Sequence, residues 1–344
     1  MWQPQEWLAQ QTKLCQERGR GLFIANVQYV PQLLPLMQAA AENGLYVATA
    51  SQLCALQEFL PGVPVIELPL SAGGNACSSY DDGSDMPFFL PDCWAPDEAG
   101  LKAWQDAFSG SRAVWQQVFR GALAGKLFSD GASRERFYAE YLQNLWQCEI
   151  KELANVSDEL KFYRFLRAAA MAGGSVMNYA NLANAAEITS PTAKSWLKLL
   201  AGAGVVRFLE PVAVIGSRRL AKAPKLYFTD TGLAAYLLHL VDTQALAASG
   251  YAAALWETYV LACIYQSWLQ GLKRPRLSYY RDSNAKEISL LLEKDSTLYP
   301  MEIKRDRSSL KACAKKLRLL DPLSDSGLRV GPGTLVNPGE ILKL

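Results

Sequence analysis

The segment KEISLLLEKDSTLYPMEIK, residues 286–304, places acids and lysines around two apolar runs. The runs predict two short strands joined by a polar turn. Because side chains alternate along a strand, Glu302 and Lys304 are expected on one face of the second strand. Carboxylates can hold Mg²⁺, which activates water and stabilises a phosphate under attack. Three interpretations fit this pattern: a site that cuts phosphodiesters, a disabled copy of one, or an ordinary solvated hairpin.

A second pattern spans residues 178–212, NYANLANAAEITSPTAKSWLKLLAGAGVVRFLEPV. It predicts a short helix, a turn, and a second helix with Ser190 as N-cap and Pro191 as first helical residue. The second helix is expected to end near Ala203 and to pass into a strand. This order is typical of a helix-turn-helix followed by a wing.

Such a module suggests contact with DNA. The outer face of the second helix would turn polar residues toward a major groove; these are Thr192, Lys194, Ser195 and Lys198. The basic run GSRRLAKAPK would follow the wing and contact backbone phosphates, through Arg218, Arg219, Lys222 and Lys225. The alternative is that the module binds another protein or acts as a rigid spacer.

Charge is distributed unevenly along the chain. Residues 1–150 carry nine Lys/Arg against sixteen Asp/Glu, a net charge of −7, and the rest carries 26 against 17, a net charge of +9. A polyanion would therefore bind the second half, if one binds. A solvated basic surface explains the same asymmetry.

Length and composition favour a globular protein of two or three domains, since the chain has 344 residues and half of them are apolar. Neither a secretion leader nor a membrane span is expected, and a cytoplasmic protein is the default. The seven cysteines are an odd number, are scattered and form no C-x-x-C pair. This argues against a disulfide framework and against a zinc site.

The chain is expected to fall into several regions. Residues 1 to about 70 alternate helical patterns with short apolar runs, which is the rhythm of an α/β layer fold. Residues 72–100 are rich in Gly, Ser, Asp and Pro and predict a long loop or linker. Helices are expected after it, then the compact helix-turn-helix segment, then a mixed α/β tail.

Several stretches together resemble a prokaryotic family of AAA-type ATPases whose C-terminal portion is known as domain of unknown function 4143. They occur in the order and spacing of that family: KFYRFLRAAAMAGGSVMNYANLANAAEITSPTAKSWLKLLAGAGVV, LAKAPKLYFTDTGLAAYLL, LWETYV, YYRDSNAKEISLLL and LYPMEIK. The resemblance covers roughly residues 110–310. It implies an α/β multidomain protein with a P-loop (AAA-like) part, a winged helix-turn-helix and a C-terminal PD-(D/E)xK nuclease-like α/β domain.

On this resemblance the domain layout is a truncated P-loop ATPase remnant at 1–71, a loop or linker at 72–110, a helical connector at 111–172, a winged helix at 173–240 and a restriction-endonuclease-like domain at 241–344.

The resemblance also assigns a nuclease-like quartet. Its helix acid maps to Glu257, its strand Asp to Ser289, and its Glu-x-Lys pair to Glu302 and Lys304. Ser289 is neutral and a poor ligand for Mg²⁺, so a metal held by Glu302 would lose its central carboxylate. Glu287 stands two residues before Ser289 and is expected on the same strand face, from which its longer side chain could reach inward.

The N-terminal part resembles the family with its nucleotide site altered. The two Walker B acids map to Ala25 and Asn26, which can neither hold Mg²⁺ nor polarise water well. Ser51 and Gln52 match the sensor strand. No G-x-x-x-x-G-K-[ST] loop precedes them, and GALAGKLF at 121–128 has the wrong spacing. ATP hydrolysis by this chain alone is therefore not expected, and the chain resembles a degenerate, N-terminally truncated member.

These observations predict a non-catalytic protein that binds nucleic acid or acts as a scaffold. The expected partner is double-stranded DNA, and no cofactor is expected. One alternative is a weak Mg²⁺- or Mn²⁺-dependent nuclease that uses Glu257, Glu287, Glu302 and Lys304. Another is an interaction partner that pairs with an intact ATPase paralogue.

Overall fold

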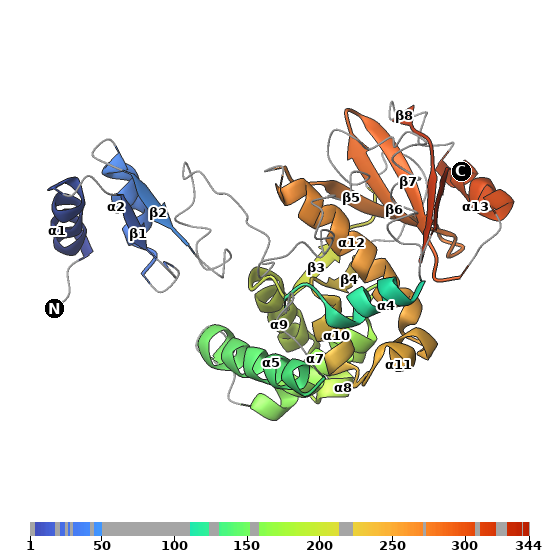
Figure 1. The fold of residues 1–344 in the computed structure, drawn as a ribbon, viewed down its shortest axis with the longest axis horizontal. Coiled ribbons are helices and arrows are strands. Elements are labelled where there is room, and N and C mark those ends of the chain that lie inside the picture. The colour runs from blue at the N-terminus through green and yellow to red at the C-terminus, as the bar shows by residue number, and fades with distance from the viewer. Residues whose placement is uncertain are drawn as a thin grey trace.

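The protein is a mixed α/β chain, as the sequence predicts, and its architecture is described from a computed structural model (Figure 1). The described residues are 4–17, 21–24, 27, 30–41, 45–49, 111–123, 131–151, 158–212, 223–270, 273–306, 310–320, 329–338 and 340–343. They contain three sheets, of two, six and two strands.

A small N-terminal unit has an α/β arrangement. Strands β1 (Leu22–Ile24) and β2 (Tyr46–Ala48) pair in parallel. Helices α1 (Pro4–Glu17) and α2 (Leu33–Ala39) pack with them around Leu8, Leu34 and Met37. Parallel strands need a crossover, and α2 lies between β1 and β2 in the chain.

The middle of the chain is helical. Its elements are α4 (Ser111–Arg120), α5 (Gly131–Asn144), the π-helical turn η5 (Leu145–Ile150), α7 (Glu159–Met171), α8 (Tyr179–Ala186), α9 (Ser190–Gly202), α10 (Thr231–Leu237), α11 (Thr243–Ala248) and α12 (Ala252–Gln270). One continuous core joins buried side chains from all of these helices. In the part of the chain that the structure describes, no helix is both long and apolar enough to cross a membrane.

The predicted pair of helices at 178–203 is present as α8 and α9. Helix α8 ends at Glu187, whose backbone is left-handed with φ 55°, and this reverses the chain within a short turn. The expected N-cap was wrong by one residue: Thr189, not Ser190, caps α9, because its hydroxyl accepts a hydrogen bond from the Thr192 backbone N–H at 3.3 Å. Ser190 and Pro191 then fill the first turn, where Pro loses no hydrogen bond.

Strands follow this helix pair. β3 (Val206–Leu209) pairs antiparallel with β4 (Lys225–Phe228). The chain after β3 then joins the C-terminal sheet, because Val212 N–H donates to the Tyr279 carbonyl at 2.8 Å and Tyr279 N–H donates to the Glu210 carbonyl at 3.0 Å. The helical part and the C-terminal sheet are therefore linked by backbone hydrogen bonds.

The C-terminal sheet has the strand order β10-β9-β7-β6-β5, with β8 pairing beside β7. Its strands and helices are β5 (Arg276–Arg281), β6 (Glu287–Lys294), β7 (Thr297–Ile303), α13 (Leu310–Leu317), the 3₁₀ turn η6 (Arg318–Leu320), β8 (Arg329–Val330), β9 (Thr334–Asn337) and β10 (Glu340–Lys343). The two strands predicted within 286–304 are confirmed as β6 and β7, which pair antiparallel around a turn at Asp295 and Ser296.

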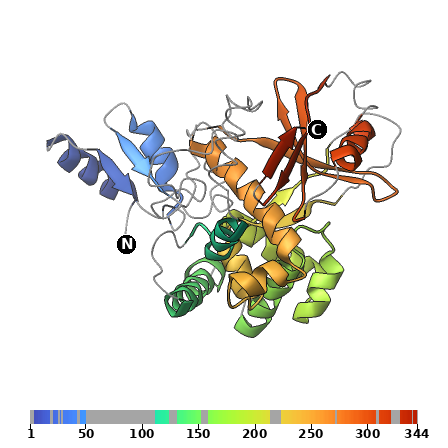
Figure 2. The same cartoon turned by 45° about the vertical axis from the view of Figure 1, so that its right-hand side comes forward.

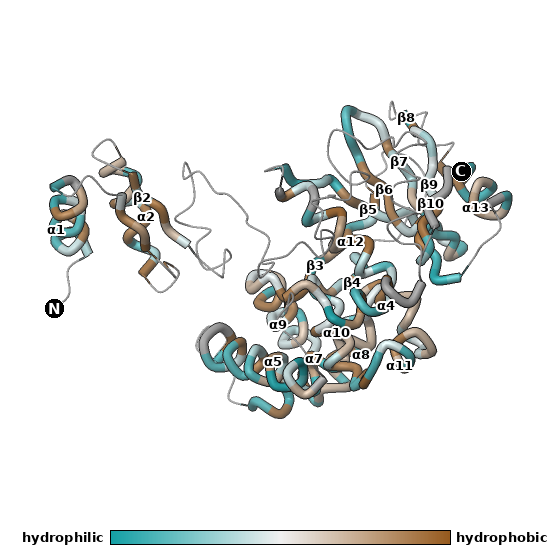
Figure 3. The backbone as a smooth tube through the Cα atoms, viewed as in Figure 1, coloured by the Kyte–Doolittle hydropathy of each residue, from teal (hydrophilic) through white to brown (hydrophobic). Residues whose placement is uncertain are grey.

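Helices cover both faces of this sheet. Leu290, Leu292 and Met301 belong to the large core that contains α12, whereas Leu291 and Leu298 pack with Leu320 after α13. Figure 2 shows α12 between the sheet and the other helices of the middle part. Figure 3 shows apolar residues along α12 and the adjoining strands. The alternation of β6 and β7 thus divides their side chains between an α12 face and an α13 face.

Asp230 forms a buried junction between α4, α5 and α10. It caps α10, because its Oδ1 accepts a hydrogen bond from Leu233 N–H at 2.6 Å. The same oxygen accepts from the Tyr138 hydroxyl at 2.9 Å, and Oδ2 accepts from Leu123 N–H at 2.9 Å. Gly121 passes so close that a Cβ there would lie 2.6 Å from both carboxylate oxygens. Asp230 is therefore an organising residue of the fold.

Candidate functional site

The outer face of α9 is polar. Lys194, Ser195 and Lys198 are exposed and Thr192 is half-buried, while the opposite face buries Ala193, Trp196, Leu197 and Leu200. Lys198 shares one side of the helix with Ser195 and Lys194, because it follows them by three and four residues. The structure therefore brings these predicted residues together on one surface of the described chain.

The predicted wing contacts are only partly described. Arg218, Arg219 and Lys222 lie outside the described residues. Lys225 does not lie on the surface as expected, because only 2% of it is exposed. Strand β4 runs between the helical core and the C-terminal sheet, and this position encloses the first side chain of the strand. The prediction that Lys225 contacts phosphate is therefore wrong, because its side chain lies inside the protein.

Lys225 instead joins two carboxylates. Its ammonium donates to Glu257 Oε1 of α12 at 3.2 Å and to Glu287 Oε1 of β6 at 2.5 Å. Tyr227 donates its hydroxyl to Glu257 Oε1 at 2.8 Å, and Arg281 donates to Glu287 Oε2 at 3.1 Å. Two cations thus neutralise two carboxylates in a cluster shared by β4, α12, β5 and β6.

Burial and charge act against each other in this cluster. Burial raises the pKa of Glu257, and the Lys225 ammonium and the Tyr227 hydroxyl oppose that rise. Burial alone would lower the pKa of Lys225, but Glu257 and Glu287 together raise it above its ordinary value. Burial also raises the pKa of the Tyr227 phenol. The cluster therefore keeps Lys225 protonated and Tyr227 neutral.

Glu302 forms a second ionic cluster. Its side chain is 0% exposed, and its Oε2 lies 3.0 Å from the Lys316 ammonium of α13 and 3.3 Å from the Lys304 ammonium. Glu302 and Lys304 do lie on one side of β7, as predicted. Among the described residues Glu302 Oε1 has no hydrogen-bond partner. Both lysines reach solvent, with side chains 38% exposed at Lys304 and 35% at Lys316.

The structure separates the predicted quartet. Glu257 pairs with Lys225 on the α12 face, whereas Glu302 pairs with Lys316 on the α13 face. Ser289 is buried in β6, next to Leu290, whose partner on β7 is Met301. Across the described residues, no three acid, His or Cys side chains gather closely enough to hold a metal ion. The acids assigned to one metal site therefore belong to two ionic clusters.

Glu287 lies on the α12 face of β6, and its sharing of that face with Ser289 stays a prediction. The register between β5 and β6 shifts between Ser278 and Tyr280, opposite Leu291 and Ile288. Such a bulge places an extra residue in one strand and interrupts the alternation. Glu287 stands before this bulge, paired with Arg281, and bonds Lys225 and Arg281 on the α12 face.

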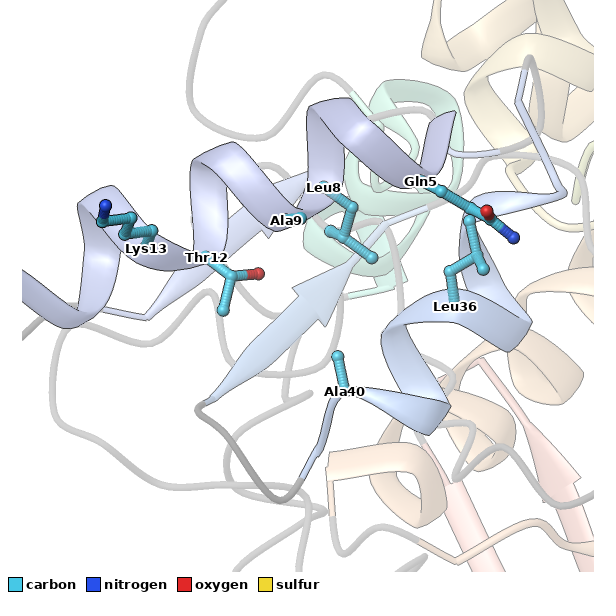
Figure 4. Close-up of a pocket in the computed structure, with 7 residues that line it drawn as sticks. All are labelled: Gln5, Leu8, Ala9, Thr12, Lys13, Leu36 and Ala40. Carbon is cyan, nitrogen blue, oxygen red and sulfur yellow. The ribbon is translucent and has the colours of Figure 1, made fainter. Parts of the chain in front are cut away.

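The nucleotide-site residues Ala25, Asn26, Ser51 and Gln52 lie outside the described residues, as does most of GALAGKLF. In the described part of the N-terminal unit, α1 and α2 line a hollow of about 380 Å³, whose residues include Gln5, Leu8, Thr12, Lys13 and Leu36 (Figure 4). Its lining holds one charged side chain, Lys13, and no carboxylate. The hollow offers no set of groups for catalysis.

Sequence reasoning missed Lys316 and the inward direction of Lys225. A signal for Lys316 existed in the run LKACAKKLRLL, residues 310–320, where Cys313 and Leu320 are buried between basic residues. That spacing predicts an amphipathic helix against the sheet. For Lys225 no local signal existed, because its partners lie 32 and 62 residues away.

Comparisons with known proteins place two domains in this chain. Residues 114–244 match the model of a domain of unknown function (DUF8612), a stretch that includes both the helices before residue 172 and the helix pair α8–α9. Uncharacterized proteins of Mycobacterium bovis and Mycobacterium tuberculosis are each 32% identical over 168 residues, 48% of this chain and 36% of the relative. The match thus spans about a third of the length of these relatives.

No solved structure matches the chain. Residues 252–342 match the model of a second domain of unknown function (DUF4143). The C-terminal sheet and α12 therefore form the DUF4143 domain that the sequence resemblance predicted.

Proposed function

We propose that this chain binds double-stranded nucleic acid without cutting it, and that α8, α9, β3 and β4 form a winged helix-turn-helix that makes the contact. The observation that carries the proposal is the two-sided character of α9. Its inner face is buried and apolar, and its outer face exposes Lys194, Ser195 and Lys198. An exposed helix of this kind suits a major groove.

The dimensions of α9 support this use. A helix of 13 residues is about 20 Å long, which is enough to cross a major groove. Its N-terminus, capped by Thr189, exposes backbone N–H groups that favour a phosphate. Lys194 and Lys198 lie one helical turn apart, so that both ammonium groups can reach the backbone of one duplex.

The proposal extends to the other parts of the chain. We interpret the C-terminal sheet with α12 and α13 as a nuclease-like fold without cleavage activity, and the N-terminal β1–α2–β2 unit as a remnant of a P-loop ATPase domain. Two features support loss of cleavage: Ser289 stands where the resemblance expects an Asp, and Glu257 and Glu302 are held in separate ionic clusters.

Fluorescence anisotropy with a short labelled duplex across a salt series tests this function. We expect binding that weakens as salt rises, because phosphate contacts release counterions. The double variant Lys194→Gln/Lys198→Gln should lower the magnitude of the salt slope by about 2, one for each lysine. Lys286→Gln, which removes an exposed lysine from the β5–β6 turn, is the matched control.

Two outcomes would reject the proposal. Absence of binding at low salt would favour a protein partner such as an ATPase paralogue. Cleavage of the duplex with Mg²⁺ but not with EDTA, lost in Glu302→Ala, would instead establish the nuclease alternative.

A further inference from the structure

Helix α13 and the turn after it carry a basic surface that the proposed α9 contact does not use. Residues 310–320 contain four Lys/Arg and no Asp or Glu. The exposed members are Lys311, Lys315 and Arg318, and Lys316 is half-buried beside them. The other side of this segment packs Cys313 and Leu320 into the fold. The basic side therefore faces solvent, whereas the apolar side is packed against the rest of the fold.

The buried side chain of Glu302 lies beneath this surface and pairs with two of its lysines. The buried carboxylate draws the ammonium groups of Lys304 and Lys316 to one oxygen, at 3.3 and 3.0 Å. Two positive charges and one negative charge leave a local excess of +1 at the surface. Each ammonium has three N–H donors, of which Glu302 uses one. The remaining donors are suited to an anion that approaches from solvent.

We propose that Lys304 and Lys316, held by Glu302, bind a backbone phosphate of a nucleic acid, and that Lys311, Lys315 and Arg318 continue the contact along neighbouring phosphates. The proposal rests on the proposed nucleic-acid binding and adds a second surface to it. We name this the α13 surface, comprising Lys304, Lys311, Lys315, Lys316 and Arg318.

The arrangement of charges favours a polyanion over a single small anion. Lys311 and Lys315 are four residues apart, so they lie about 6 Å apart along the helix axis. A nucleic acid presents a phosphate about every 3.4 Å along the axis of each strand. A row of cations can therefore meet several phosphates of one backbone, whereas inorganic phosphate meets one or two lysines.

An acidic lipid surface fits less well. Helices that bind membranes insert an apolar face between lipids. On α13 the apolar side is packed against the sheet through Cys313 and Leu317 and, beyond the helix, through Leu320. Charge alone would then have to hold the protein to a bilayer.

The α13 surface is separate from α9. Figures 1 and 2 place α13 on the side of the C-terminal sheet away from α12 and the helical part, which contains α9. The two surfaces therefore make independent contacts, and their effects on binding free energy should add.

The first test is anisotropy of the full chain with a duplex long enough to span both surfaces. Lys311→Gln/Lys315→Gln should weaken binding several-fold and lower the magnitude of the salt slope by about 2. Lys286→Gln should leave both unchanged. Adding Lys311→Gln/Lys315→Gln to the Lys194→Gln/Lys198→Gln variant should weaken duplex binding by the same factor as in wild type. Vesicles of anionic and of zwitterionic lipid and free inorganic phosphate as competitor complete the series.

Glu302→Gln provides the sharper test. Removal of the buried negative charge raises the local excess from one positive charge to two, so we expect tighter duplex binding and a steeper salt slope. A role of Glu302 in holding Mg²⁺ predicts the opposite, a loss of any Mg²⁺-dependent binding. Thermal melting of each variant reports whether it is folded, and Lys311→Gln/Lys315→Gln, which changes only exposed positions, keeps the proposal testable if Glu302→Gln unfolds the chain.

The outcomes separate the two proposals. If the α13 variants bind like wild type while the α9 variant does not, this inference is wrong and the proposed function stands. If only the α13 variants lose binding, the α9 contact is wrong and this inference stands. Binding to anionic vesicles without binding to duplex would overturn the inference, as would an unchanged or weaker affinity in folded Glu302→Gln.

Discussion

At the scale of single residues, burial separates a lysine that holds the fold together from one that reaches solvent. Lys225 and Lys304 were both expected to act on phosphate, but the Lys225 side chain is 3% exposed and the Lys304 side chain 38%. Lys225 bonds two carboxylates from other elements. Its replacement would leave those carboxylates without their shared cation, which costs more than the ion pair itself contributes.

Lys225→Met should therefore destabilise the protein by about 3 kcal/mol, measured by urea denaturation. The triple variant Lys225→Met/Glu257→Gln/Glu287→Gln should recover much of this loss because it buries no uncompensated charge. Lys286→Met, at an exposed position, should change stability little. A loss below about 1 kcal/mol in Lys225→Met, the range of a surface ion pair, would contradict the role assigned to this cluster.

The same cluster predicts a dependence on alkaline pH. The pKa of Lys225 lies above its ordinary value of 10.5, so the folded state holds this proton more tightly than the unfolded chain does. This contribution to stability is complete below pH 10.5 and is lost as the pH rises through the folded value. Tyr227, whose pKa is raised from 10.0, acts in the same direction.

Urea titrations from neutral to strongly alkaline pH measure this effect. The free energy of unfolding of wild type should fall more steeply than that of Lys225→Met, which retains the tyrosine contribution alone. Parallel curves for the two proteins would show that Lys225 does not hold its proton more tightly in the folded state.

At the scale of elements, helix caps show how one residue type can serve different ends. Asp230 and Asp242 both cap helices, α10 and α11, through a hydrogen bond from the third residue of each helix. Asp242 is exposed, and the described contacts of its carboxylate consist of the hydrogen bond from that N–H, at 2.7 Å. Asp230 is buried and also bonds Tyr138, Ala122 and Leu123. The two positions form a matched pair.

Asp242→Ala should cost about 1 kcal/mol, the usual value of a cap, whereas Asp230→Ala should cost about 3 kcal/mol because it leaves several buried donors without an acceptor. Thermal or urea unfolding of the two variants measures the difference. Equal losses at the two positions would mean that the bonds to α4 and α5 contribute nothing to stability.

The elements themselves were predictable where the pattern is local. The turn before α9, the proline in its first turn and the two apolar runs of β6 and β7 lie within short windows, and both pairs of elements were confirmed at those places. The bulge opposite Tyr279 could not be predicted, because it depends on how β5, distant in sequence, pairs with β6.

At the scale of the whole molecule, the residues that could do chemistry were identified by type, but their grouping was not. Glu257, Glu302 and Lys225 were each singled out, yet their partners come from separate helices and strands. The sheet with helices on both faces assigns Glu257 to the α12 face and Glu302 to the α13 face. Grouping of this kind is decided by tertiary packing, which residue spacing alone does not encode.

The molecule then presents two basic surfaces, one on α9, which packs into the large core, and one on α13, which packs beside a separate small core. The salt dependence of duplex binding by the wild-type chain is the most direct measurement of this account. Contacts by Lys194, Lys198 and the five residues of the α13 surface predict a slope of log affinity against log salt of about −6, close to one unit for each cation. A slope near zero, or no binding at low salt, would contradict nucleic-acid binding by this chain.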